Sequence, residues 1–263
     1  MKKKEVRPNR IIFLGTGGAR VVVFKQIRAS GGIWFSVDGT DFIVDPGPGA
    51  LIRSLEKGLK PRSLEGIILS HRHLDHSADI NVMIEAMTEG GFVKKGVVFA
   101  PRDALEDDPV IFRYVRNYPE KVEILKAGEK YRIGNVSFEP PVKHIHGNAE
   151  TYGFNFHTSN CEISYLSDTR FFPELTNHYK SDLLIVNVVR LQASNLDHLC
   201  MEDVKRIVMK CKPRVAILTH FGMTLLRANP WKQAKSLEDS TGIKVVVAKD
   251  GMVFDIDKME VSS

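Results

Sequence analysis

The feature of the sequence that most restricts the fold is a cluster of three histidines and one aspartate within six consecutive residues, His71-Arg72-His73-Leu74-Asp75-His76. This cluster directly follows the apolar segment 66–70, which is typical of a buried strand. A loop at a strand end can turn several side chains toward one pocket, whereas a strand alternates them between two faces. Neutral imidazole and carboxylate groups bind zinc and similar divalent ions. We therefore predict a metal site here, with a chance grouping on an exposed loop as the alternative.

Short apolar segments rich in valine, isoleucine and phenylalanine recur along the chain, as in strands. They cover residues 11–14, 33–37, 42–45, 66–70, 96–100, 135–139, 163–167, 182–188, 215–219 and 243–247. Segments with helical periodicity separate several of them, at 50–57, 78–87, 110–117, 201–211 and 230–240. Turn-forming residues at 37–40, 126–129 and 158–161 indicate hairpins. We expect one α/β domain over residues 1–263, with two sheets covered by outer helices.

The composition is that of an ordinary soluble globular protein, with 43% hydrophobic and 26% charged residues. No apolar stretch approaches the roughly 20 residues needed to span a bilayer, and no apolar signal core follows the charged first five residues. We therefore expect a cytoplasmic protein without membrane contact. The net charge of +5 is compatible with a polyanionic substrate but too small to predict nucleic-acid binding by itself. The three cysteines have neither disulfide nor metal-site spacing, and we expect buried thiols at Cys161, Cys200 and Cys211.

Further histidines and aspartates follow other strand-like segments. His144 and His146 would share one face of an extended segment, and we expect only one of them to bind a metal. Asp168 follows segment 163–167, either as a metal ligand or as the cap of a helical turn, and His220 follows segment 215–219. Asp45 ends segment 42–45, where it either orients a ligand histidine through the other ring nitrogen or simply occupies a turn.

The pattern His71-x-His73-x-Asp75-His76 resembles the His-x-His-x-Asp-His signature of the metallo-β-lactamase-fold hydrolases. The resemblance extends over most of the chain, because later segments match the other metal-binding positions of the family in the expected order. It implies a four-layer αββα sandwich of two mixed β-sheets flanked by helices. It also implies two divalent ions, with zinc as the leading candidate and manganese or iron as alternatives. The implied ligands are His71, His73 and His146 on one ion, Asp75, His76 and His220 on the other, and Asp168 shared.

Two details of the resemblance refine this expectation. The family's ligand histidine lies a few residues before an aromatic–glycine pair, here Tyr152-Gly153, which favours His146 over His144. His198 resembles an extra histidine of the phosphodiesterase branch, which includes the RNA 3′-end processing ribonucleases. There the side chain reaches toward the scissile group as an acid or a charge stabiliser, whereas capping of the following helix is the alternative for His198.

The resemblance implies hydrolysis by a metal-bridging hydroxide, with Asp75 and His198 as catalytic residues. The leading substrate is a phosphodiester: a small molecule or nucleotide, a cyclic nucleotide, or an RNA end. Ester, thioester or lactone hydrolysis is the alternative, and a non-catalytic metal-binding protein is a third. Aspartate at position 168, where true β-lactamases usually carry cysteine, argues against antibiotic hydrolysis. No long tRNA-binding arm of the ribonuclease Z type is apparent, and nothing in the sequence indicates an oligomeric state.

A glycine-rich segment, Gly15-Thr16-Gly17-Gly18-Ala19-Arg20, superficially suggests a dinucleotide-binding turn. Its third glycine is missing, and residues 21–24 are predicted to be a strand or an extended loop, whereas the dinucleotide turn opens a helix. The resemblance instead implies that this Gly-Thr-Gly segment lies near the metal pocket.

Overall fold

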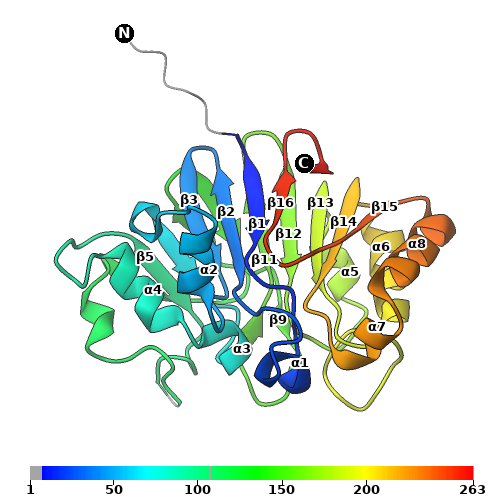
Figure 1. The fold of residues 1–263 in the computed structure, drawn as a ribbon, viewed down its shortest axis with the longest axis horizontal. Coiled ribbons are helices and arrows are strands. Elements are labelled where there is room, and N and C mark those ends of the chain that lie inside the picture. The colour runs from blue at the N-terminus through cyan, green and yellow to red at the C-terminus, as the bar shows by residue number, and fades with distance from the viewer. Residues whose placement is uncertain (1–7, 107, 263) are drawn as a thin grey trace, which may run out of the picture.

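Two β-sheets pack face to face in the computed structural model, which describes residues 8–106 and 108–262. Figure 1 shows helices α2 (Ala50–Glu56) and α4 (Ile80–Met87) outside one sheet, and α6 (Met201–Cys211) and α8 (Pro230–Thr241) outside the other. This is the αββα arrangement of two mixed sheets that the sequence predicts.

The first sheet carries the side chains that follow β3 and β4. Its strand order is β17 (Glu260–Val261), β16 (Met252–Asp255), β1 (Arg10–Phe13), β2 (Ile33–Val37), β3 (Thr40–Val44), β4 (Gly66–Ile68), β5 (Val97–Ala100) and β6 (Lys121–Ile124). Neighbours from β17 to β3 pair antiparallel, and those from β3 to β6 pair parallel. Because parallel strands end at the same edge, Asp45 and the cluster that begins at His71 emerge side by side.

The second sheet presents its ligands in the same way. Its order is β15 (Lys244–Val247), β14 (Val215–Thr219), β13 (Leu183–Asn187), β12 (Glu162–Leu166), β11 (Phe154–His157), β8 (Val136–Glu139) and β7 (Tyr131–Ile133). Strands β12 to β15 are parallel, so Asp168, Asn187 and His220 appear together at their carboxyl ends. A separate two-stranded pair, β9 (Lys143–His144) and β10 (Thr151–Tyr152), flanks the loop that carries His146.

The hydrophobic core fills the space between the sheets and the two spaces beneath the helices. Side chains alternate along β13, where Leu183 and Ile185 join the central cluster while Leu184 and Val186 pack under the outer helices. In the centre, the rings of Phe35 and Phe42 stack at 4.7 Å, and Phe156 of the other sheet lies 5.2 and 5.3 Å from them. This interlocking fixes the two sheets, and thereby the two sets of ligands, relative to each other.

Short helices complete the chain. They are α1 (Arg20–Phe24), α3 (Leu74–Ser77), α5 (Leu175–His178), α7 (Met223–Arg227) and the 3-10 turns η1 (Pro61–Ser63) and η2 (Val115–Asn117). Helix α6 begins with a capping box between Cys200 and Asp203. All three cysteines are free and buried, as expected. Within residues 8–106 and 108–262, no helix has both the length and the apolar character required to cross a membrane.

Three local predictions are wrong. Residues 110–117 are not a helix beyond the 3-10 turn η2, because most of them are β-branched or aromatic, and Asn81 Oδ1 accepts the Phe112 N–H at 2.9 Å. The turn at 126–129 does not close a hairpin, since it links β6 of the first sheet to β7 of the second. Residues 21–24 lie in helix α1 and not in a strand. The glycine-rich segment still has no dinucleotide-binding topology, because β1 pairs antiparallel with the next strand, β2.

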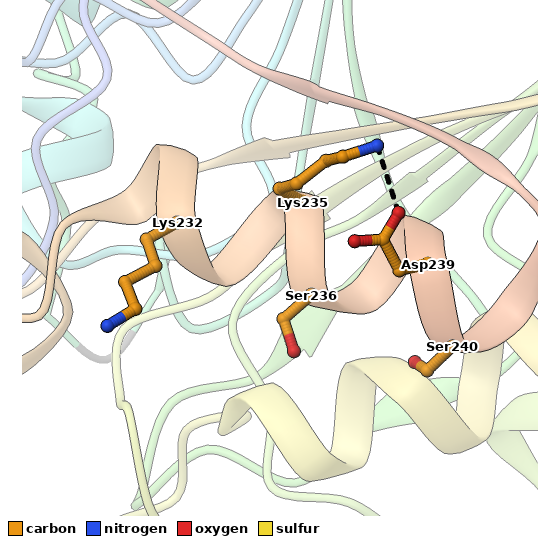
Figure 2. A pocket seen from close by; sticks show the side chains of 5 residues that line it. All are labelled: Lys232, Lys235, Ser236, Asp239 and Ser240. Carbon is orange, nitrogen blue, oxygen red and sulfur yellow. Dashed lines mark ion pairs between the residues drawn. The ribbon is translucent and has the colours of Figure 1, made fainter.

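A groove on the outer surface shares no lining residue with the histidine cluster. It is lined by Lys232, Lys235, Ser236, Asp239 and Ser240 on α8, beside α6 (Figure 2). The carboxylate of Asp239 is already paired with Lys235 at 2.9 Å. Because the remaining groups are exposed lysine and serine side chains, this groove has no converging donors for a metal.

Candidate metal centre

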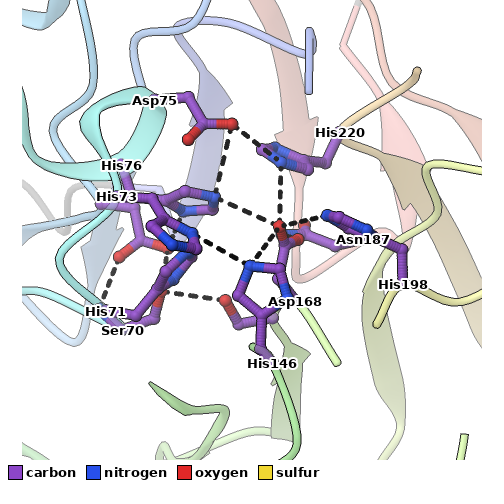
Figure 3. A network of polar contacts seen from close by, with 12 residues as sticks. Ser70, His71, His73, Asp75, His76, His146, Asp168, Asn187, His198 and His220 are labelled. Atoms are coloured by element: carbon purple, nitrogen blue, oxygen red, sulfur yellow. Dashed lines mark hydrogen bonds and ion pairs between the residues drawn. The ribbon is translucent and has the colours of Figure 1, made fainter. Parts of the chain in front are cut away.

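The histidines and aspartates at the carboxyl ends of the strands converge on one point between the two sheets (Figure 3). Their ligand atoms form overlapping groups in which all atoms lie within 4.8 Å of one another. The groups are His71, His73 and His146; His71, His76 and Asp168; Asp75, His76 and His220; and His146, Asp168 and His198. Every residue predicted for the site from the sequence is therefore brought into this cluster.

The first group joins two loops. His73 Nδ1 lies 3.0 Å from both His71 Nε2 and His146 Nε2. The Nδ1 of His71 faces the Ser70 hydroxyl oxygen at 3.0 Å, and the Nδ1 of His146 faces the Asp197 carbonyl oxygen at 2.8 Å. These oxygens hold the N–H of each ring on Nδ1, so both Nε2 atoms present lone pairs. A single N–H on His73 can satisfy only one of them, and a cation between the three nitrogens would satisfy all.

Burial also keeps this group in the form that binds metals. It holds the pKa of His71 well below its ordinary value and lowers the pKa of His73 to about 4. The pKa of His146 is likewise lowered, with burial as the main cause. All three imidazoles are therefore neutral near pH 7, which is the form that coordinates a metal.

The second group contains buried polar atoms without partners. His76 Nε2 lies 4.0 Å from Asp75 Oδ2, and His220 Nε2 lies 3.5 Å from the same oxygen. Neither Nε2 atom has a hydrogen-bond partner, although both are buried. A buried polar atom without a partner is costly, and a divalent cation is the natural partner for two imidazole nitrogens beside a carboxylate. The donor set of the centre thus fits divalent metal ions.

Asp168 lies between these groups. Its Oδ2 is 3.4 Å from the Nε2 atoms of His198 and His220, and 3.7 Å from those of His76 and His146. Burial would by itself raise the pKa of this carboxyl, but the surrounding imidazoles, led by His220, hold the pKa well below its usual range. Asp168 is therefore a carboxylate whose Oδ2 faces imidazoles of both groups.

Asp45 contacts the second group through His76. It accepts hydrogen bonds from the Ser70 N–H at 2.6 Å and the Ser70 hydroxyl at 2.7 Å. It also lies 2.9 Å from His76 Nδ1 and 2.9 Å from the Tyr165 hydroxyl. Asp45 thus has the arrangement of a residue that orients a ligand histidine, as the sequence suggested, and is not a plain turn aspartate.

The choice between the two histidines of residues 143–147 follows from their contacts. His144 Nε2 lies 2.6 Å from the Tyr179 hydroxyl, and its Nδ1 lies 3.2 Å from the Asp168 carbonyl oxygen. Both nitrogens of His144 are thereby engaged by a tyrosine hydroxyl and a backbone carbonyl, and neither faces a ligand atom of the cluster. His146 lies inside the cluster, as the sequence favoured.

His198 lies in the loop before α6 and belongs to the outer side of the cluster. Its ring centroid is 4.8 Å from that of His146, and its side chain is 18% exposed. The N-cap residue of α6 is Cys200, so His198 does not cap this helix. The more exposed members of the cluster are His73, Asp75 and His198, whereas His71, His76 and Asp168 are buried. The cluster is therefore open to solvent on the side of His198.

The Gly-Thr-Gly segment lies against the second group. The Gly18 N–H donates to the Phe221 carbonyl at 3.2 Å, and the Phe221 N–H donates to the Thr16 carbonyl at 2.8 Å. A side chain at Gly18 would overlap the ring of His220. The glycine is therefore required for the close approach of this loop to His220.

Two buried residues of the site, Asn187 and Tyr165, were not predicted. Asn187 Nδ2 donates to Asp168 Oδ1 at 2.9 Å and to the Tyr165 hydroxyl oxygen at 3.2 Å. Asn187 ends an apolar strand, as Asp168 nearly does, and this shared position was a usable signal. Nothing in the sequence around Tyr165 indicated its contact with Asp45, which lies far away in the chain.

Comparison with known proteins decides the family. Residues 40–221 match the beta-lactamase superfamily domain. The chain belongs to the beta-lactamase superfamily. A relative from Methanocaldococcus jannaschii, described only as an uncharacterized protein, is 31% identical to this superfamily member over 94% of both chains. A ribonuclease Z from Methanopyrus kandleri is 35% identical over a shorter stretch, which covers 26% of this chain and 23% of that protein.

Solved structures of the superfamily share the same architecture. The metallo-beta-lactamase fold protein YhfI from Bacillus subtilis superposes with a TM-score of 0.79 at 20% identity, covering 94% of this chain and 99% of that one. A diphosphatase from the PhnP family superposes with a TM-score of 0.70 at 19% identity, covering 94% and 97% of the two chains. The chain therefore has the metallo-β-lactamase fold, and its relatives include the ribonuclease Z branch of the superfamily.

Proposed function

We propose that this protein is a hydrolase that uses two divalent metal ions, most readily zinc, to cleave a phosphodiester bond. The observation that carries the proposal is the position of Asp168, whose Oδ2 lies 3.4 to 3.7 Å from imidazole nitrogens on both sides of the cluster. A carboxylate oxygen in this position can be shared by two cations. A carboxylate that only formed a structural ion pair would need just one of these imidazoles.

The residues divide into two ligand sets around Asp168. His71, His73 and His146 would hold one ion, and Asp75, His76 and His220 would hold the other. Divalent ions held by these residues would supply water activated as a nucleophile near neutral pH and would stabilise negative charge on the substrate. Asp45, Ser70 and the Asp197 carbonyl orient the histidine rings, so the protein provides a preformed site.

His198 supports a phosphodiester as the substrate. Its Nε2 faces Asp168 Oδ2 at 3.4 Å on the open side of the cluster, where a leaving group of a bound substrate would lie. An imidazole in this position can donate a proton to a departing alkoxide. Asp75 is also only partly buried and can accept a proton from the attacking water. The similarity to a diphosphatase and to a ribonuclease Z supports cleavage at phosphorus, on a nucleotide, a cyclic nucleotide or an RNA end.

The test compares substrates under identical metal loading. Protein reconstituted with zinc is assayed with bis-p-nitrophenyl phosphate and with p-nitrophenyl acetate, as wild type, Asp168→Ala and His157→Ala. His157 is a suitable control because it lies outside the cluster and contacts Glu162. We expect diester turnover in the wild type and the control but not in Asp168→Ala. Turnover of the acetate alone would favour the ester, thioester or lactone alternative, and absence of metal binding after reconstitution would refute the proposal.

A further inference from the structure

A buried series of hydrogen bonds leads from Asp168 of the cluster across to the other sheet. Tyr165 of β12 and Asn187 at the end of β13 belong to the second sheet, whereas Asp45 follows β3 of the first. This series runs from Asp168 Oδ1 to Asn187 Nδ2 over 2.9 Å, on to the Tyr165 hydroxyl over 3.2 Å, and on to Asp45 Oδ2 over 2.9 Å. Each of these four side chains is buried, with 3% or 4% of its surface exposed.

The direction of each hydrogen bond follows from the number of donors. The amide nitrogen of Asn187 has two N–H groups, and these point to Asp168 and to the Tyr165 oxygen. The Tyr165 oxygen therefore accepts one hydrogen bond, and its own proton is donated to Asp45. No alternative arrangement satisfies these groups, since the two carboxylates can only accept.

Asp45 is surrounded by four donor groups as a result. The Ser70 N–H lies at Oδ1, and the Ser70 hydroxyl, the Tyr165 hydroxyl and His76 Nδ1 all lie at Oδ2. The fourth contact requires a proton on His76 Nδ1. In the neutral form of His76 that binds a metal, the lone pair therefore lies on Nε2, which is the buried atom without a hydrogen-bond partner.

At the other end of this series of hydrogen bonds, Asn187 fixes the orientation of the Asp168 carboxylate. Because Asn187 occupies Oδ1, the free Oδ2 is directed at the imidazoles of both ligand groups. The amide group of Asn187 therefore sets the orientation of Asp168. Through Tyr165 it also affects the hydrogen bonds of Asp45, which in turn orients His76.

We propose that Tyr165 and Asn187 are positioning residues that couple the shared ligand Asp168 to the Asp45–His76 pair, so that the two metal positions are formed together. The inference rests on the proposed dinuclear function. The proposed role of Tyr165 can be separated from its packing, because a phenylalanine at position 165 would fill the same space and lack only the hydroxyl. Loss of the hydroxyl would leave Asn187 with an unpaired buried N–H and Asp45 with one donor fewer.

The test uses a matched pair of tyrosine variants. Tyr179 is also fully buried, and its hydroxyl contacts His144, which lies outside the cluster. Zinc affinity is measured for wild type, Tyr165→Phe, Asn187→Leu and Tyr179→Phe by competition with a chromophoric chelator, and thermal unfolding of each metal-free protein is recorded. Cobalt substitution provides a second readout, because its visible spectrum reports the geometry of the ligands.

We expect Tyr165→Phe and Asn187→Leu to weaken zinc binding by about 10- to 100-fold, the usual effect of losing a group that orients a ligand. The cobalt spectrum of both variants should change, while Tyr179→Phe keeps the affinity and spectrum of the wild type. Equal effects of the two tyrosine variants, or unchanged zinc affinity in both Tyr165→Phe and Asn187→Leu, would overturn the inference. Failure of the wild type itself to bind two zinc ions would instead overturn the proposed function.

Discussion

Replacing His198 by alanine separates the binding of the metals from the chemistry of the leaving group. His198 lies on the open side of the cluster, with Nε2 3.4 Å from Asp168 Oδ2 and its side chain 18% exposed. Both proposed ligand sets remain complete without it. We therefore expect His198→Ala to bind the same amount of zinc as the wild type.

The expected loss of activity depends on the leaving group. A positioned general acid contributes about 10²- to 10⁴-fold to a rate, which corresponds to about 2.7–5.5 kcal/mol in the activation free energy. This full loss should appear in kcat for a diester with an alkoxide leaving group, such as a dinucleotide. The loss should be much smaller for bis-p-nitrophenyl phosphate, because p-nitrophenolate departs without a proton.

The assay measures kcat, KM and zinc content for both substrates, in wild type, His198→Ala and the distant control His157→Ala. Similar losses with both substrates would contradict the role of His198 as an acid. Because His146, Asp168 and His198 could also hold an ion, a lower zinc content in His198→Ala would show that His198 is a ligand instead.

Three further predictions follow from the structure. Gly18→Ala should lower zinc affinity, because the added methyl group overlaps the ring of His220; unchanged affinity on titration would count against this contact. Phe156→Ala should reduce the free energy of unfolding by about 3–5 kcal/mol in urea titrations, and a loss below about 1 kcal/mol would be inconsistent with its place in the core. Although burial opposes its charged form, Asp168 raises the pKa of His220 to about 9, so metal-free protein should lose stability as pH rises from about 6.5 through about 9. Zinc-loaded protein should lack this loss, since a metal replaces the proton; a flat melting temperature of the metal-free protein over this range would refute the reasoning.

The parts of the site that the sequence predicted are those that follow strands. His71, Asp168 and His220 come after apolar runs, and parallel strands bring such positions to one edge of a sheet. His146 is different, because it lies in a loop after β9, and the residues alone did not separate it from His144. The resemblance to the family favoured it through its distance from Tyr152-Gly153.

The parts that the sequence did not predict depend on contacts between distant segments. Tyr165 contacts Asp45, 120 positions away in the chain, and no local pattern around a tyrosine in a strand reports this. Strand β16 (Met252–Asp255) was also missed, since only alternate residues are buried and its apolar run is short. The error at residues 110–117 has the opposite cause, because an apolar spacing suggested a helix that β-branched and aromatic residues disfavour.

The most direct test of the dinuclear centre is anomalous X-ray scattering at the zinc edge from crystals of the zinc-reconstituted protein. The account predicts two peaks roughly 3.5–4 Å apart, one among His71, His73 and His146 and the other among Asp75, His76 and His220, with Asp168 between them. A single peak, or two peaks that do not share Asp168, would contradict it.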